Sequence, residues 1–84
     1  MIINALHVGD YCVVNSGVII GNKNKSEDKP IIGNNVEITI GAKVIGKIII
    51  GDNVIVAPNS VVIKDVPNNA VVSGIPAKIL KFND

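Results

Sequence analysis

Residues 48–64 read IIIGDNVIVAPNSVVIK. The stretch is rich in branched aliphatic side chains, but Gly51-Asp52-Asn53 and Pro58-Asn59 interrupt it at short, even intervals. Ile and Val favour extended backbone, whereas Gly, Asn, Asp and Pro favour turns. The stretch therefore predicts short strands that are separated by sharp corners.

These aliphatic residues are part of a six-residue repeat that runs through most of the chain. Counted in steps of six, with one step of twelve, ten positions are occupied by Ile or Val in every case: Ile2, Val8, Val14, Ile20, Ile32, Ile38, Val44, Ile50, Val56 and Val62. Ile and Val make up 29 of the 84 residues, so ten chance matches would occur on the order of once in tens of thousands of trials. The repeat is a property of the fold.

A six-residue unit of this kind is a short extended piece plus a corner, too short for a hairpin and wrong for a helix. It is typical of a parallel β-helix, in which three units make one triangular coil and stacked coils pair their strands in parallel. The sequence therefore predicts an all-β, single-stranded, three-sided solenoid that is filled by the repeated aliphatic residues. A smaller inward position is expected four residues after most of them: Leu6, Cys12, Val18, Val36, Ala42, Ile48, Val54, Ser60 and Val66.

The repeat predicts one domain over residues 1–84 with one excursion and one cap. Residues 22–30, NKNKSEDKP, contain no aliphatic residue, and we expect them to leave the coil as a loop, which is either a functional element or a plain solvated excursion. After Val66 the repeat ends, and we expect residues 67–84 to pack across the last coil, as the end of a solenoid requires.

Composition excludes several classes of partner. The net charge is +1 with no long run of like charges, so we expect neither nucleic acid nor a membrane surface as a partner. The start MIINALHVGD lacks the basic and apolar regions of a signal peptide, which predicts a cytoplasmic location. Cys12 is the one cysteine and is expected to be a small core residue.

Several motifs resemble those of the hexapeptide-repeat acyltransferases, most closely the C-terminal part of bacterial serine acetyltransferases. They are the units VGDYCV, IGNNVE and IGDNVI, together with GVIIG at 17–21, SVVIKDVP at 60–67 and GIPAKIL at 74–80. The resemblance covers nearly the whole chain. It implies a left-handed parallel β-helix, a homotrimer with sites between neighbours, and acetyl transfer from acetyl-CoA to a small-molecule hydroxyl acceptor such as serine, a step of cysteine biosynthesis.

The resemblance also bears on the catalytic residues. The histidine that such enzymes use as a base is expected a few residues ahead of Met1, so the chain is expected to be truncated at its N-terminus. His7 is the one histidine of the sequence; it is a weak catalytic candidate and is otherwise an exposed surface residue, because it directly precedes an inward residue. A single histidine also predicts no metal site of the three-histidine kind.

By the same resemblance, the acetyl-CoA site is expected between subunits along the coils. Ile40, Gly41, Pro58 and Ile63 match positions that approach the coenzyme. Lys64, Lys78 and Lys81 match basic positions near its phosphates, which lysine can serve as a flexible point charge; an ordinary charged surface is the alternative for these three lysines.

Three functions remain open at this point. The first is an O-acetyltransferase of the serine acetyltransferase type. The second is a sugar or nucleotide-sugar acyltransferase, which would share the same motifs. The third is a non-catalytic trimeric scaffold that retains the fold without a catalytic base.

Overall fold

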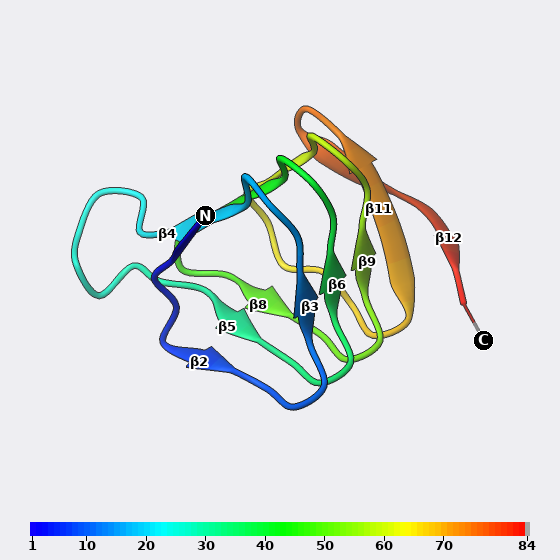
Figure 1. Cartoon of the computed structure of the whole chain (residues 1–84), viewed down its shortest axis with the longest axis horizontal. Helices are drawn as coiled ribbons and strands as arrows, with labels where there is room; N and C mark the ends of the chain where they lie inside the picture. Colours follow the sequence, from blue (N-terminus) through cyan, green and yellow to red (C-terminus); the bar gives the residue numbers. More distant parts are fainter. Residues whose placement is uncertain (84) are drawn as a thin grey trace.

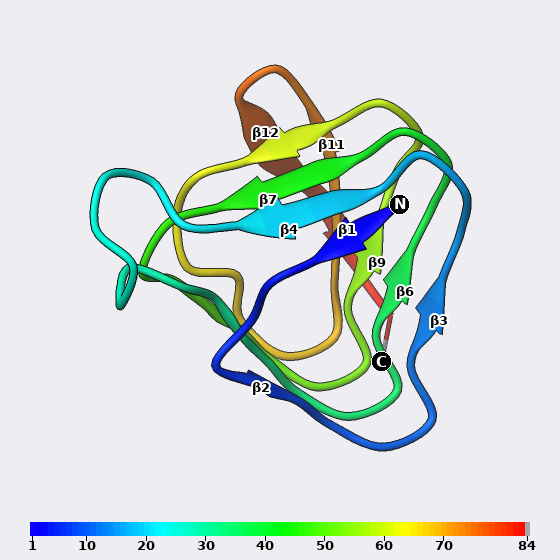
Figure 2. The ribbon, with the colours of Figure 1, turned by 60° about the vertical axis from the view of Figure 1, so that its left-hand side comes forward.

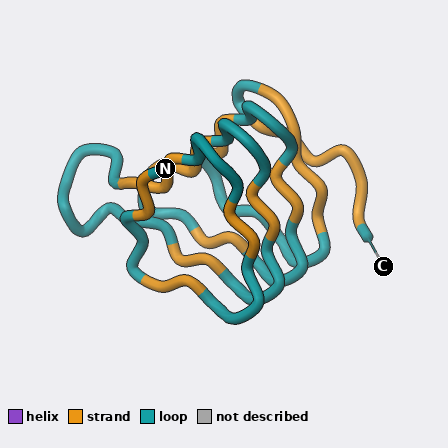
Figure 3. The backbone as a smooth tube through the Cα atoms, in the orientation of Figure 1, coloured by secondary structure: helices purple, strands orange, loops and turns teal. Residues whose placement is uncertain are grey.

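The computed structural model describes residues 1–83, and these residues form strands and turns without any helix (Figure 3). None of them is therefore in a helix long and apolar enough to cross a membrane. The strands are β1 (Ile2–Ile3), β2 (His7–Val8), β3 (Val13–Val14), β4 (Ile19–Gly21), β5 (Ile31–Ile32), β6 (Glu37–Ile38), β7 (Lys43–Ile45), β8 (Ile49–Ile50), β9 (Ile55–Val56), β10 (Val61–Val62), β11 (Ala70–Gly74) and β12 (Ala77–Phe82).

The strands build three sheets, which are the three sides of a prism (Figures 1 and 2). Sheet one has the order β1-β4-β7-β10, sheet two β2-β5-β8, and sheet three β12-β11-β9-β6-β3. Consecutive strands from β1 to β11 thus fall in different sheets, and each pairs in parallel with its equivalent one coil away. The last two strands, β11 and β12, lie in the same sheet and pair in the antiparallel direction. The predicted three-sided parallel β-helix is confirmed.

The core is a set of aliphatic stacks, one behind each sheet. Ile20 stacks with Val44 and Val62 in sheet one, Ile32 with Ile50 in sheet two, and Ile38 with Val56 and Val72 in sheet three. All of these residues are at most 2% exposed. Because each stacked side chain contacts the equivalent aliphatic of the next coil, a chain with almost no aromatic residues still fills its interior.

The first coil departs from the predicted register. Ile2 was expected to point inward, but Ile2 pairs with the outward Ile19, and Ile3 pairs with the buried Ile20. The corner between Ile3 and Val8 is one residue shorter than the repeat, so a strict count of six selects the wrong neighbour at this end. The inward residues of the first coil are partly exposed, as for Val8 at 37%, because this coil is an end of the described stack.

The repeat also shortens near the other end. Val66 forms a parallel bridge with Ile50, only four residues after the inward Val62. In the preceding coil, the amide of the first strand residue of sheet two, Ile31, donates to the backbone carbonyl of Ile48 at 2.9 Å. Here the amide of Ile49 donates to Asp65 Oδ1 instead, at 2.8 Å. The side chain of Asp65 therefore replaces a carbonyl that the shorter corner cannot supply.

The polar segment after β4 leaves the prism as a loop. Figure 1 shows this loop projecting from the stack between β4 and β5. Gly21 before the loop pairs with Ile45, and Ile31 after it pairs with Ile49, so the coils continue in register on both sides. Within the loop, the amide of Asp28 donates to the carbonyl of Lys25 at 3.0 Å.

The predicted C-terminal cap begins as a continuation of the coil. In β11, Val71 and Val72 pair in parallel with Ile55 and Val56, so Val72 extends the aliphatic stack of sheet three. The chain then reverses, and β12 pairs with β11 in the antiparallel direction. We therefore retain the single-domain prediction, with a cap that starts as one more side of the prism; its final residue, Asp84, lies outside the described residues.

Side-chain hydrogen bonds connect the coils at the corner between sheets two and three, which we call the Asx corner (Asp10, Asn34, Asp52 and Asn68). The amides of the first three residues each donate to the side-chain oxygen of the equivalent residue in the next coil, at 2.7 to 2.8 Å. The preceding residues in the first three coils are Gly9, Gly33 and Gly51, and a Cβ on any of them would collide with that same side-chain oxygen. Glycine at these positions makes the ladder of hydrogen bonds possible.

Candidate functional site

The corner between sheets three and one, which we call the Gly41 corner (residues 15–17, 40–41 and 58–59), has a different construction. Its coils are connected through the backbone: the amide of Gly41 donates to Ser16 O at 3.0 Å, and that of Asn59 donates to Ile40 O at 2.9 Å. Gly17, Gly41 and Asn59 all have positive φ, between 58° and 75°. The hydrogen bonds between coils at this corner are thus made by the backbone, while the Asn59 side chain packs over Gly41, where an added Cβ would collide with it.

Three of the seven predicted coenzyme residues lie together at this corner. Ile40, Gly41 and Pro58 occupy neighbouring coils, and the Ile40 side chain is 55% exposed. The amide of Ile40 donates no hydrogen bond within residues 1–83, so it is available to an acceptor on a ligand. Pro58 has no N–H, so the next coil offers no equivalent donor.

Ile63 and Lys64 lie at the other end of β10 from Pro58. Pro58 and Ile63 are five positions apart, so the distance between their backbones is at most about 17 Å, at ~3.3 Å per residue. Both residues are exposed. Only a long, extended ligand along sheet one could contact this pair and the Gly41 corner together.

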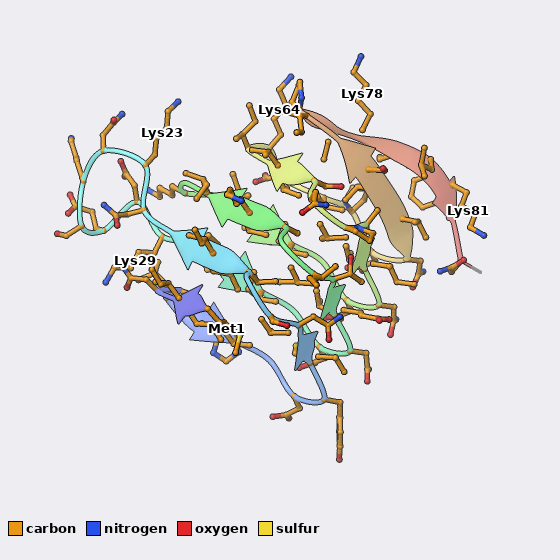
Figure 4. All side chains as sticks on the ribbon, turned by 45° about the horizontal axis from the view of Figure 1, so that its top comes forward. Met1, Lys23, Lys29, Lys64, Lys78 and Lys81 are labelled. Carbon is orange, nitrogen blue, oxygen red and sulfur yellow. The ribbon has the colours of Figure 1, made fainter. Side chains whose placement is uncertain are left out.

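The two tail lysines lie on β12, opposite Ser73 (Lys78) and Val71 (Lys81) in β11. Figure 4 shows Lys64 and Lys78 projecting from the same end of the prism, with Lys81 further along β12. The β11–β12 turn is held to the neighbouring coil because the amide of Gly74 donates to Ser60 Oγ at 3.2 Å. Ser60 is 1% exposed, so this contact is a rigid connection between the cap and the Gly41 corner.

His7 lies apart from these residues. It is in β2 of sheet two, exposed and next to the inward Val8, as the alternation predicted. In a three-sided prism, sheet two is the side opposite the Gly41 corner. His7 therefore cannot reach a ligand at that corner of the same chain.

Sheet two carries a hollow that was not predicted from the sequence. It measures about 180 Å³ and is lined by Leu6, Lys29, Ile31, Lys47, Ile49 and Asp65. The spacing of two lysines could have indicated this hollow. Residues one coil apart in sheet two, such as Ile31 and Ile49, differ by 18 in number, and Lys29 and Lys47 also differ by 18. In the described part of the chain, no three His, Cys, Asp or Glu side chains gather as a metal site would require.

Comparison with known protein families identifies the repeat. Residues 29–64 match the family model described as bacterial transferase hexapeptide (six repeats). The chain is a left-handed parallel β-helix built from this hexapeptide repeat.

The similar proteins are serine acetyltransferases. The chain is 45% identical over 75 residues to serine acetyltransferase of Synechococcus elongatus, an alignment that covers 87% of this chain and 31% of that protein. Serine acetyltransferase of Staphylococcus aureus strain Mu50 is 45% identical over 76 residues, covering 88% of this chain and 36% of its own length. The predicted resemblance is thus confirmed, and the chain spans about a third of the length of these relatives.

Solved structures agree with the sequence comparison. Serine acetyltransferase of Brucella abortus strain S19 superimposes with a TM-score of 0.92 at 33% identity, over 100% of this chain and 35% of that one. The same protein in complex with coenzyme A gives a TM-score of 0.71 at 31% identity, over 93% of this chain and 38% of that one.

Proposed function

We propose that this chain is the coil region of an acetyl-CoA-dependent O-acetyltransferase of the serine acetyltransferase type. The observation that carries the proposal is the 45% identity with serine acetyltransferases over 87% of the chain. The geometry supports it, because Ile40, Gly41 and Pro58 form one exposed corner and the Lys64 and Lys78 ammonium groups project from the end of the prism next to it.

The acetyl-CoA would lie along sheet one. The amide of Ile40 would donate to a carbonyl of the pantetheine arm, and Ile63 would contact the arm further along. The ammonium groups of Lys64, Lys78 and Lys81 would neutralise the phosphates. These residues bind and orient the thioester; the acceptor hydroxyl then loses a proton to a base, attacks the thioester carbonyl and displaces the thiolate. We assign no residue of this chain as the base; His7 lies on the side of its own prism opposite the Gly41 corner.

The proposal includes a homotrimer in which neighbouring prisms cover each other's outer faces. Ile40 and Ile63 are 55% and 50% exposed, and exposed large aliphatics of this kind are typical of association surfaces. A cytoplasmic location is also part of the proposal, and the free thiol of Cys12 is of the kind that reducing compartments maintain. Analytical ultracentrifugation measures the mass of the assembly, and a monomer at micromolar concentration would contradict the trimer.

Calorimetric titration with coenzyme A tests the proposed groove. Because these lysines are exposed, each charge is expected to contribute about 0.2–1 kcal/mol, so Lys64→Gln and Lys78→Gln should each weaken binding roughly 1.4- to 5-fold. Lys25→Gln, in the excursion loop, is the matched control and should leave the affinity unchanged. Equal losses in all three variants would mean a general charge effect and would contradict the groove.

Turnover is measured as thiol release from acetyl-CoA with serine as the acceptor. Release with serine supports the proposal, whereas release with sugars alone would favour the sugar acyltransferase. Coenzyme binding without turnover on any hydroxyl would identify these 84 residues as a binding scaffold, the function that the position of His7 favours for the isolated chain.

A further inference from the structure

The hollow on sheet two is separate from the proposed coenzyme groove. It adjoins the corner between sheets one and two, where the excursion loop leaves the prism, and residues from four successive coils line it: Leu6, Lys29 and Ile31, Lys47 and Ile49, and Asp65. At about 180 Å³ it is smaller than pockets for drug-sized ligands, which begin at about 300 Å³. It therefore suits a small molecule rather than a whole coenzyme.

The charges of the hollow favour an anion. Lys29 and Lys47 each lie two residues before a paired residue of adjacent coils, Ile31 and Ile49, and paired strands are about 4.8 Å apart. Within residues 1–83, the lysine ammonium that donates a hydrogen bond is that of Lys43, to the Gly41 carbonyl at 3.1 Å. The two ammonium groups and the Asp65 carboxylate all line the hollow, so it has a formal charge of +1, which favours an anion.

The floor of the hollow is aliphatic. Ile31, Ile49 and Leu6 are 38%, 55% and 56% exposed, which leaves a large apolar surface uncovered beside the two lysines. Asp65 also lines the hollow, and its Oδ1 already accepts the amide of Ile49 at 2.8 Å. The Asp65 carboxylate repels the charged group of an anionic ligand, so it favours an orientation with the anionic end at Lys29.

We propose that this hollow binds a small amphipathic anion, namely a carboxylate or phosphate group on a short aliphatic body. The anionic group lies between Lys29 and Lys47, and the aliphatic body covers Ile31 and Ile49. Lys29 is preorganised for this role because it is half-buried and directly precedes the fully buried Pro30 at the base of the loop.

Amide NMR titration of the whole chain tests the site with four probes. Hexanoate and hexyl phosphate carry both required features, whereas 1-hexanol lacks the charge and inorganic phosphate lacks the aliphatic body. We expect saturable shifts at Ile31, Lys47 and Ile49 with hexanoate or hexyl phosphate, at an affinity at least fivefold above that of either control probe. The stronger of the two amphipathic probes identifies the anionic group.

Charge variants sharpen the test. Lys29→Gln and Lys47→Gln should each weaken hexanoate or hexyl phosphate binding roughly 1.4- to 5-fold, as expected for half-exposed charges. Lys23→Gln is the matched control: it lies in the same loop, but Lys23 and Lys29 point in opposite directions in Figure 4, and the Lys23 Cβ is 3.6 Å from where a Cβ on Gly46 would lie. Thermal melting of each variant verifies that it is folded.

Three results would overturn the site: hexanol binding as tightly as hexanoate, an equal loss of affinity in Lys23→Gln, or shifts that map away from sheet two. A coenzyme A titration of the same variants separates this proposal from the proposed function. Lys29→Gln and Lys47→Gln should leave coenzyme affinity unchanged, so either proposal can fail without the other.

Discussion

The Asx corner and the Gly41 corner are built from the same six-residue unit but are closed in different ways. At the Asx corner, amides donate both to backbone carbonyls and to the side-chain oxygens of the next coil, as Asp52 does to Asn68 Oδ1 at 2.8 Å. At the Gly41 corner, the hydrogen bonds between coils are made by backbone groups, and the amide of Ile40 donates no hydrogen bond within residues 1–83 while its side chain is exposed. A corner that uses its polar groups internally stabilises the stack, whereas a corner that leaves them free can bind a ligand.

The largest expected effect is on the glycines of the Asx corner. In Gly51→Ala the new Cβ would lie 2.7 Å from the backbone nitrogen of Asn68 and would also collide with the Asn68 side chain. Because backbone must move, we expect a loss of about 2–4 kcal/mol in the free energy of unfolding, measured by chemical denaturation. Gly21→Ala is the control, since nothing lies within 4 Å of its added Cβ; an equal loss there would contradict the role of close approach.

A smaller effect is expected from the ladder itself. Asn68→Ala removes the acceptor of the Asp52 amide and should reduce the free energy of unfolding by about 0.5–1.5 kcal/mol, the usual contribution of one hydrogen bond. Thermal melting of Asn68→Ala beside Asn24→Ala, in the excursion loop, measures the difference. If coenzyme A affinity also fell in Asn68→Ala, the two corners would not be functionally separate.

The smallest effect concerns the Gly41 corner. Pro58→Ala restores an amide beside that of Ile40 and releases a fixed φ, so stability should fall by only about 0.4–1 kcal/mol. If the coenzyme follows this corner, the added donor should raise coenzyme A affinity by about 2- to 10-fold, which corresponds to one hydrogen bond. Calorimetric titration measures this change, and an affinity that falls or stays constant would remove Pro58 from the proposed groove.

Much of the architecture could be predicted because Ile or Val recurs at every sixth position of the sequence. The inward stacks at Ile20, Val44 and Val62 follow from a strict count of six, and the structure confirms them. The count fails at the first corner, which is one residue shorter, so Ile3 rather than Ile2 points inward.

The candidate sites were predicted less completely, for a geometric reason. Residue types and motif resemblance selected Ile40, Gly41 and Pro58, but they carried no information on which side of the prism each residue would occupy. The position of His7 opposite the Gly41 corner depends on the order of the three sheets. The pairing of Lys29 with Lys47 depends on an excursion loop that returns the chain to the same register.

The amino-acid sequence by itself determined the repeating unit, because branched aliphatics at every sixth residue can be buried together only by extended segments that turn at regular corners. The tertiary structure decided what each corner is for. Backbone amides compete for the nearest acceptor, and only the stacked coils bring the Asn68 oxygen to the Asp52 amide. The same stacking leaves the Ile40 amide and the Lys29 and Lys47 side chains without a hydrogen bond in the described chain.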